Sequence, residues 1–129
     1  MVTLKQRLST RGFTMIELMV VLAVVALLLT LVAPRYFHQE ELAKEQALQY
    51  NLQMLRKTLD DYKADKGKYP RSLQELVTTR YIRVIPPDPL TGSADSWLLI
   101  PEEHGKQGIY DIKSAARGVA SDGSRYADW

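Results

Sequence analysis

Glu17 is the residue whose chemistry stands out, because it is the single charged side chain in the apolar stretch of residues 13–33. A carboxylate at the middle of a bilayer costs about 2.5–3.5 kcal/mol, and less near the surface, so an acid retained in such a segment usually has a partner. In the simpler interpretation, Glu17 lies at the membrane surface and favours the positive N-terminus of its helix. In the other, it takes part in assembly with another chain.

Catalytic patterns are scarce in the remainder of the sequence. There is no cysteine, no glycine-rich phosphate loop and no H-E-x-x-H pattern. His38 follows the apolar stretch among charged residues and His104 lies in a Glu-Glu-His-Gly segment, so we expect both to be solvated. Asp60 and Asp61 are adjacent on a predicted helix and point to different faces. The sequence therefore predicts a protein that is not an enzyme.

Charge is concentrated at the N-terminus. The chain has 129 residues and a formal net charge of +2, while its first twelve residues carry three basic and no acidic side chains. The basic excess belongs to this leader, and no basic patch is interleaved with aromatic residues, which argues against nucleic-acid binding. Without cysteines, packing, a metal or neighbouring chains must stabilise the domain.

The apolar stretch is long enough to cross a membrane. Its 21 residues span roughly 31 Å as a helix. Lys5, Arg7 and Arg11 precede it with no acid among them, so the N-terminus is predicted to stay cytoplasmic and the remainder to be exported. A cleaved secretory signal fits poorly, because its apolar region is about 7–15 residues long and here Pro34 follows directly after the run.

Residues 12–18, Gly-Phe-Thr-Met-Ile-Glu-Leu, resemble the signal of type IV pilins and type II secretion pseudopilins. The resemblance implies that a prepilin peptidase cuts between Gly12 and Phe13 and methylates the new N-terminal Phe13. Glu17 is then the fifth mature residue and is implied to pair with the free amine of Phe13 on a neighbouring subunit, which sets the register of assembly. A plain signal-anchor protein is the alternative.

A second helical segment is predicted at residues 35–66, which contain no Gly or Pro. Its apolar residues from Leu48 to Tyr62 recur at intervals of four and three, which predicts a face that packs on a small sheet. Before Leu48 we expect the helix to stand clear of the domain. Gly67 is the predicted left-handed cap, and Pro34 is expected to kink or locally melt the helix.

The C-terminal part is predicted to contain short elements. Ser72 and Glu75 form an S-x-x-E capping box ahead of a helix at 72–80. A proline-rich turn occupies 86–92, and segments 96–100 and 109–113 are predicted to form a hairpin. The last sixteen residues are expected to be an irregular loop held by aromatic side chains.

These segments resemble the major pseudopilin of type II secretion. The similar runs are G-K-Y-P, S-L-Q-E-L, P-D-P-L-T-G, I-Y-D-I-K-S and the closing Ala-Asp-Trp. The resemblance implies an α+β, type IV pilin-like fold, in which the second half of a long helix packs on a small antiparallel sheet with a C-terminal loop. It divides the chain into a leader (1–12), an assembly helix (13–34) and a periplasmic domain (35–129, with a variable part at 67–129).

The C-terminal loop of that family often binds calcium, which needs six to eight oxygen ligands. Candidate ligands here are Asp111, Ser114, Asp122 and Asp128. Arg117 stands where the family commonly has an acid. The alternative is a loop held without metal by Trp129, Tyr126 and a salt bridge of Arg117.

The sequence thus predicts a filament subunit of a type II secretion pseudopilus. Such a subunit would be held in the inner membrane by one span, with its C-terminal domain in the periplasm. Its partners would be further copies of itself, prepilin peptidase, minor pseudopilins and an inner-membrane assembly platform. Two alternatives remain: a type IV pilin for adhesion, motility or DNA uptake, and a single-pass anchored binding module.

Overall fold

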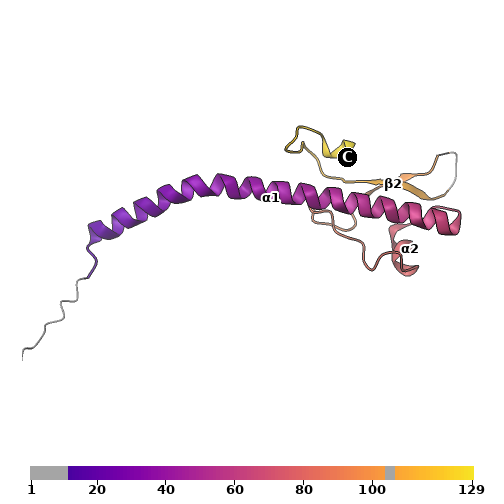
Figure 1. Ribbon diagram of the computed structural model, residues 1–129, viewed down its shortest axis with the longest axis horizontal. Helices are drawn as coiled ribbons and strands as arrows, with labels where there is room; N and C mark the ends of the chain where they lie inside the picture. The colour runs from indigo at the N-terminus through magenta and orange to yellow at the C-terminus, as the bar shows by residue number, and fades with distance from the viewer. Residues whose placement is uncertain (1–11, 104–106) are drawn as a thin grey trace, which may run out of the picture. The chain divides into compact units, whose positions relative to one another are not determined.

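The computed structural model describes residues 12–103 and 107–129, so residues 1–11 of the predicted leader and His104 lie outside the described residues. The elements are α1 (Met15–Lys66), α2 (Leu73–Thr78), β1 (Leu98–Pro101), β2 (Ile109–Lys113) and the 3-10 helix η1 (Tyr126–Asp128) (Figure 1). The chain divides into two compact units, residues 1–38 and 39–129, and α1 contributes to both.

The first unit consists, where it is described, of residues 12–14 and the beginning of α1. Every side chain from Phe13 to Val32 is exposed in the single chain, although nearly all are apolar. This part of α1 is long and apolar enough to cross a membrane. The helix continues through Pro34 without interruption, so local melting is not seen there, and the kink stays a prediction.

The second unit has a core built on one face of α1. The residues of the predicted apolar face are all buried, namely Leu48, Leu52, Leu55, Leu59 and Tyr62. They pack in one cluster with residues of α2, of the segment leading into β1 and of β2. The helix ends as predicted, since Gly67 has φ +74° and its N–H donates to the carbonyl of Lys63 at 2.8 Å.

Helix α2 is shorter than the predicted range of 72–80, and its capping box is only half confirmed. The Ser72 hydroxyl accepts the Glu75 N–H at 3.2 Å, as expected for an N-cap. The Glu75 carboxylate, however, accepts the N–H of Arg71 and the hydroxyl of Tyr62, both at 2.7 Å. It therefore fastens α2 to α1 instead of completing the box.

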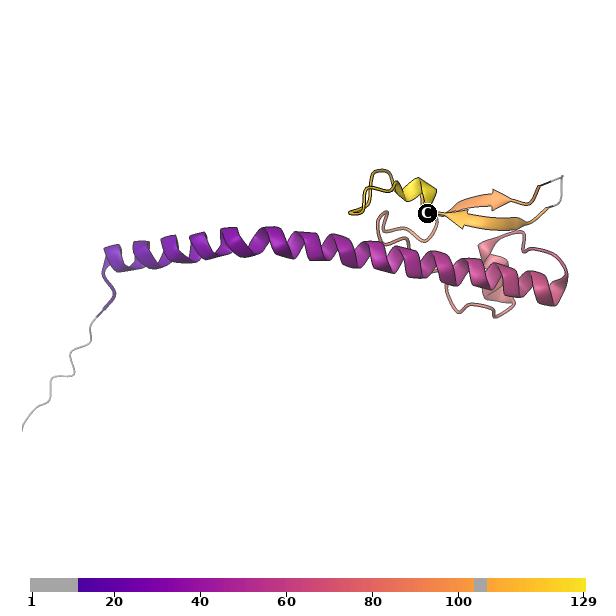
Figure 2. The ribbon, with the colours of Figure 1, turned by 45° about the horizontal axis from the view of Figure 1, so that its top comes forward.

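The predicted hairpin is confirmed, with β1 starting two residues later than expected. Strands β1 and β2 pair antiparallel, with Leu99 opposite Ile112. Ile109 and Ile112 of β2 are buried in the core, whereas Leu98 and Leu99 of β1 are exposed. In two views, the hairpin and α2 both lie beside the C-terminal part of α1 (Figures 1 and 2). The α+β fold expected from the pilin resemblance is therefore present.

The expectation that the helix stands clear of the domain before Leu48 is wrong at Glu45. This side chain is only 7% exposed and binds the C-terminal loop. The reason is visible in the spacing, because Glu45 precedes Leu48 by three residues and so lies on the same buried face. The apolar pattern did not predict the burial of Glu45, because at this position of the repeat an apolar residue would be expected and a carboxylate is present.

Candidate functional site

The segment that precedes α1, where cleavage is predicted, is exposed. Gly12, Phe13 and Thr14 lie outside the helix, and Phe13 is 82% exposed. A Cβ added to Gly12 would meet no described atom within 4 Å, and its φ is not in the left-handed region. The fold therefore does not require glycine at this position.

Glu17 lies in the first turn of α1. The Thr14 hydroxyl accepts the Glu17 N–H at 3.1 Å, which caps the helix and fixes where it begins. The carboxylate of Glu17 has no hydrogen-bond partner within residues 12–103 and 107–129. This placement fits the helix N-terminus interpretation, and it also leaves the carboxylate free to meet a cation of another chain.

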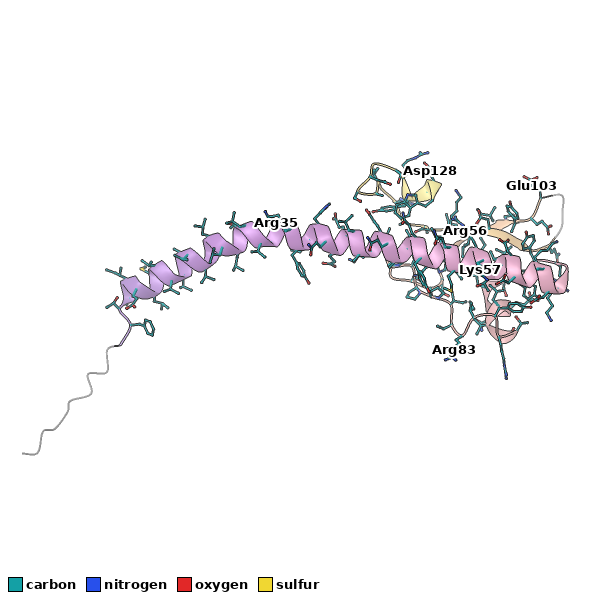
Figure 3. The ribbon with its side chains drawn as sticks, viewed as in Figure 1. Arg35, Arg56, Lys57, Arg83, Glu103 and Asp128 are labelled. Carbon is teal, nitrogen blue, oxygen red and sulfur yellow. The ribbon has the colours of Figure 1, made fainter. Side chains whose placement is uncertain are left out.

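The four predicted calcium ligands are not brought together as a free donor set. Asp111 accepts from the Arg56 guanidinium at 2.8 Å, and Asp122 accepts from the N–H and hydroxyl of Ser124. Each of these carboxylates therefore already has a donor. Arg56 also donates to the carbonyls of Ile112 and Trp129, so it joins α1 to β2 and the end of the chain (Figure 3).

The other two candidates have partners of their own. Asp128 forms a salt bridge with Arg125 at 3.0 Å, and the Ser114 hydroxyl donates to the buried carboxylate of Asp88. Within the described part of the chain, no three acidic or histidine side chains form a cluster that could hold a metal ion. Calcium needs six to eight oxygens, so this donor set as it lies does not fit a calcium ion.

The alternative arrangement of the loop is found in part. Tyr126 and Trp129 pack edge to face with ring centroids 5.1 Å apart, and the Trp129 indole N–H donates to the Ser124 hydroxyl at 2.7 Å. The salt bridge of this loop, however, uses Arg125 and not Arg117. Arg117 is exposed. Aromatic packing is therefore correctly predicted, and the basic residue is not.

Three residues that hold the domain together are absent from the sequence-based list of sites. They are Glu45 and Arg56 on α1, and Asp88, which is fully buried and accepts the N–H of Leu90 at 2.8 Å. Glu45 could have been found as an acid at an apolar position of the helical repeat. Asp88 gave only the weak signal of an acid between two prolines.

Electrostatics single out Glu45 among these residues. Hydrogen bonds from Ser121 lower the pKa of Glu45 below its ordinary value of 4.5, although desolvation acts in the opposite direction. Burial raises the pKa of Tyr126, and its hydrogen bond to Glu45 adds to this effect. Both shifts keep Glu45 charged and Tyr126 protonated at neutral pH, which is the combination that the hydrogen bond needs.

Comparison with known proteins agrees with this geometry at both ends of the chain. Residues 7–33 match the family described as the prokaryotic N-terminal methylation motif. Type II secretion system core protein G of Klebsiella michiganensis is 32% identical over an alignment of 140 positions, gaps included, that covers 96% of each chain. The protein of the same name from Klebsiella pneumoniae is 33% identical over an alignment of 135 positions that covers 92% of this chain and 94% of the relative.

A third relative extends the comparison to another genus. Core protein G of Pectobacterium carotovorum is 35% identical over an alignment of 118 positions that covers 79% of this chain and 74% of the relative. Among solved structures, none matches the chain significantly. A methylation motif that runs into a long helix, whose second part packs with a small antiparallel sheet, defines a pilin-like subunit. Within that class, the chain belongs to the family of type II secretion system core protein G, the major pseudopilins.

Proposed function

We propose that this chain is the structural subunit of a type II secretion pseudopilus and that its polymerisation into a helical filament drives protein export. The precursor is inserted in the inner membrane with its N-terminus in the cytoplasm and residues 35–129 in the periplasm. Prepilin peptidase cuts between Gly12 and Phe13 and methylates Phe13. Subunits then leave the bilayer and join a filament through their apolar helices.

One observation carries the proposal. The side chains from Met15 to Val32 present apolar surface on every side of α1, and none of them is covered by the described residues of the chain. Such a surface must be covered by lipid or by other chains, because exposed apolar surface of this extent is unfavourable in water. A subunit that first resides in the bilayer has this surface covered by lipid. Once its apolar helix bundles with those of other subunits, the surface is covered by other chains. Identical contacts that do not close into a ring produce an open helical filament.

The proposed partners follow from this role. Copies of the same chain form the filament, prepilin peptidase processes the precursor, and minor pseudopilins and an inner-membrane assembly platform initiate and extend it. The relatives named core protein G support the type II secretion machine over a type IV pilus or a solitary anchored binding module.

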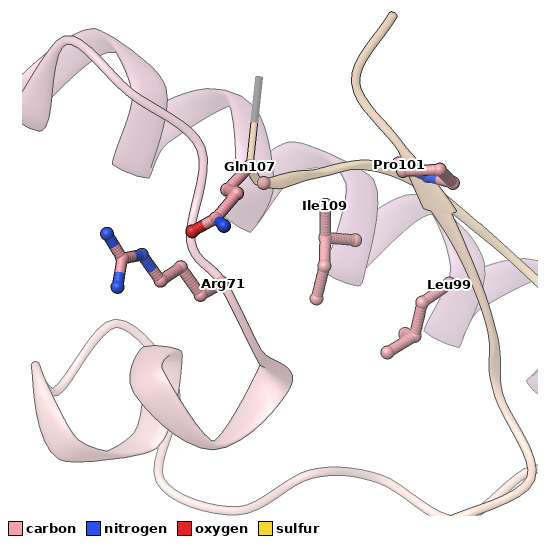
Figure 4. A pocket seen from close by; sticks show the side chains of 6 residues that line it. Arg71, Leu99, Pro101, Gln107 and Ile109 are labelled. Atoms are coloured by element: carbon pink, nitrogen blue, oxygen red, sulfur yellow. The ribbon is translucent and has the colours of Figure 1, made fainter. Parts of the chain in front are cut away.

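The proposal assigns no catalytic activity to the chain. The pocket in Figure 4 has a volume of about 430 Å³. Its lining residues are Arg71, Leu99, Pro101, Gln107, Gly108 and Ile109. They include one cation and no carboxylate or imidazole, so they offer no pair for acid–base chemistry.

The proposal is tested on the chain purified from cells that contain the complete secretion system. Intact mass should match a product that begins at Phe13 and carries one methyl group, and electron microscopy of sheared cells should show filaments when the chain is overproduced. A product that retains residues 1–12 and stays a lipid-bound monomer at every level of expression would refute it.

The assembly role of Glu17 is tested with Glu17→Gln. The variant should be processed normally, while the amount of filament falls by roughly tenfold or more, since an ion pair in an apolar environment is lost. Glu40→Gln is the matched control, because Glu40 is an exposed acid on the same helix beyond the apolar stretch. If Glu17→Gln assembles as well as the wild type, Glu17 has only the local role at the helix N-terminus.

A further inference from the structure

Glu45 joins α1 to the C-terminal loop through hydrogen bonds, most of them from the turn at residues 119–125. One carboxylate oxygen of Glu45 accepts the N–H of Ser121 at 2.8 Å and the hydroxyl of Tyr126 at 3.0 Å. The other accepts the hydroxyl of Ser121 at 2.6 Å. Three donors from two points of the loop thus converge on one side chain, which is 7% exposed.

The loop is shaped to present these donors. The N–H of Ala120 donates to the Ser124 carbonyl at 2.7 Å, and the N–H of Gly123 donates to the Ala120 carbonyl at 3.0 Å. Val119 and Arg125 form an isolated antiparallel bridge at the base of this turn. The tight turn orients both the amide and the hydroxyl of Ser121 toward Glu45. The two donors bind one oxygen each of its carboxylate.

Little else in the turn itself would hold it on α1. Between Gly118 and Ser124, only Ala120 is buried, and its side chain is a single methyl group. Burial of one methyl group contributes little to holding the turn in place. The turn from Gly118 to Ser124 therefore relies on its polar contacts, and those made by Glu45 cross the longest distance in sequence, from residue 45 to residues 121 and 126.

We propose that Glu45 is the latch of the C-terminal loop and that its side chain fastens the loop in the way that the family resemblance suggested for calcium. The four candidate calcium ligands have protein partners instead, and two of these partners, Arg56 and Arg125, are cations that oppose a bound metal ion. Calcium therefore neither binds this loop nor is needed for it to stay folded.

The test follows loop opening in the full chain held in detergent. Arg117 and Arg125 are exposed and lie within the loop, so trypsin cleavage after them reports how often the loop opens. Cleavage of the wild type should be equally slow with a chelator and with calcium at about 2 mM, a concentration above the dissociation constants of weak extracellular calcium modules. Faster cleavage in chelator would overturn the proposal.

Two variants test the latch itself from both sides of the contact. Glu45→Gln keeps the size of the side chain but removes its charge, and cleavage after Arg117 and Arg125 should rise by roughly tenfold or more. Ser121→Ala removes one donor and should give a smaller rise. Combining the two should add little to Glu45→Gln alone, because both remove the same contact.

Glu41→Gln is the matched control, since Glu41 is an exposed acid one turn earlier on the same helix. It should leave the cleavage rate unchanged. The proposal fails if Glu45→Gln is cleaved no faster than Glu41→Gln. It also fails if calcium restores protection to Glu45→Gln, because a metal would then be fastening the loop.

Discussion

The two parts of α1 each place a glutamate in an apolar pattern, and the two glutamates have different surroundings. Glu17 lies in the first turn, where the neighbouring side chains are exposed on every face. Glu45 lies in the second unit, on the single face of α1 that is buried. Of the two, only the Glu45 carboxylate has hydrogen-bond partners among the described residues, and all three of its hydrogen bonds come from its own chain.

The difference shows how one helix serves two purposes. Where the sequence is apolar on one face, the chain covers that face itself and satisfies the polar group that lies there. Where the sequence is apolar all round, the described residues do not cover that surface, and both the surface and its acid are left to lipid or other copies. The periodicity of the apolar residues therefore separates the folding part of α1 from the assembling part.

The sharpest test of this contrast is a pair of identical substitutions on the two parts. Leu55→Ala removes a fully buried side chain and should destabilise the domain by about 2–5 kcal/mol. Leu28→Ala removes a side chain that is 57% exposed in the single chain and should leave the melting of the domain unchanged. Thermal melting in detergent, followed by circular dichroism, measures both.

Equal destabilisation by the two substitutions would contradict the division of α1 into a folding and an assembling part. An effect of Leu28→Ala on filament yield, with no effect on melting, would sharpen the division further.

A smaller effect should appear on acidification, because the pKa of Glu45 is lowered in the folded chain. A carboxyl group with a lowered folded pKa stabilises the fold fully above its unfolded pKa, and this contribution is lost as the pH falls through the folded value. Glu45→Gln should therefore lower the melting temperature at neutral pH. The difference from wild type should shrink as the pH falls below 4.5, the ordinary pKa of the group.

Comparing the variant with the wild type separates the titration of Glu45 from the titration of other groups near it. The charged or titratable neighbours are Glu41, Lys44, Asp122 and Tyr126. They are present in both proteins, so their own titration largely cancels in the difference. A difference in melting temperature that stays constant down to acidic pH would show that the charge of Glu45 does not contribute.

The smallest predicted effect is a stabilisation at the end of α2. Arg80 has φ +65°, a left-handed conformation that costs a residue with a Cβ roughly 1–2 kcal/mol. Part of the gain in Arg80→Gly is lost to the greater freedom of glycine in the unfolded chain, so we expect a net stabilisation of about 0.5–1 kcal/mol.

Gly67→Ala is the mirror control, because Gly67 has φ +74° at the end of α1 and a Cβ there should lower the melting temperature. An unchanged or lower melting temperature for Arg80→Gly would mean that the arginine side chain stabilises the second unit by some other contact.

Most of the secondary structure could be predicted from local patterns. The buried face from Leu48 to Tyr62, the Gly67 cap and the Ser72 N-cap all depend on residues within a few positions of one another. Contacts between distant segments were not predictable in the same way. The Arg56 contacts with Asp111, Ile112 and Trp129 join segments at least 55 residues apart, and no spacing rule connects them.

The sequence by itself determined where the chain meets the membrane, where it is expected to be cut and which face of α1 is buried, because charge, composition and helical periodicity act over short ranges. Only the tertiary structure decided how the C-terminal loop is fastened. The candidate calcium ligands and the aromatic residues were visible in the sequence. Whether the oxygens of those ligands face an ion or an arginine depends on how the strands pack against the helix. Glu45 shows the physical reason: a carboxylate can be buried only where donors converge on it, and those donors come from the other end of the chain.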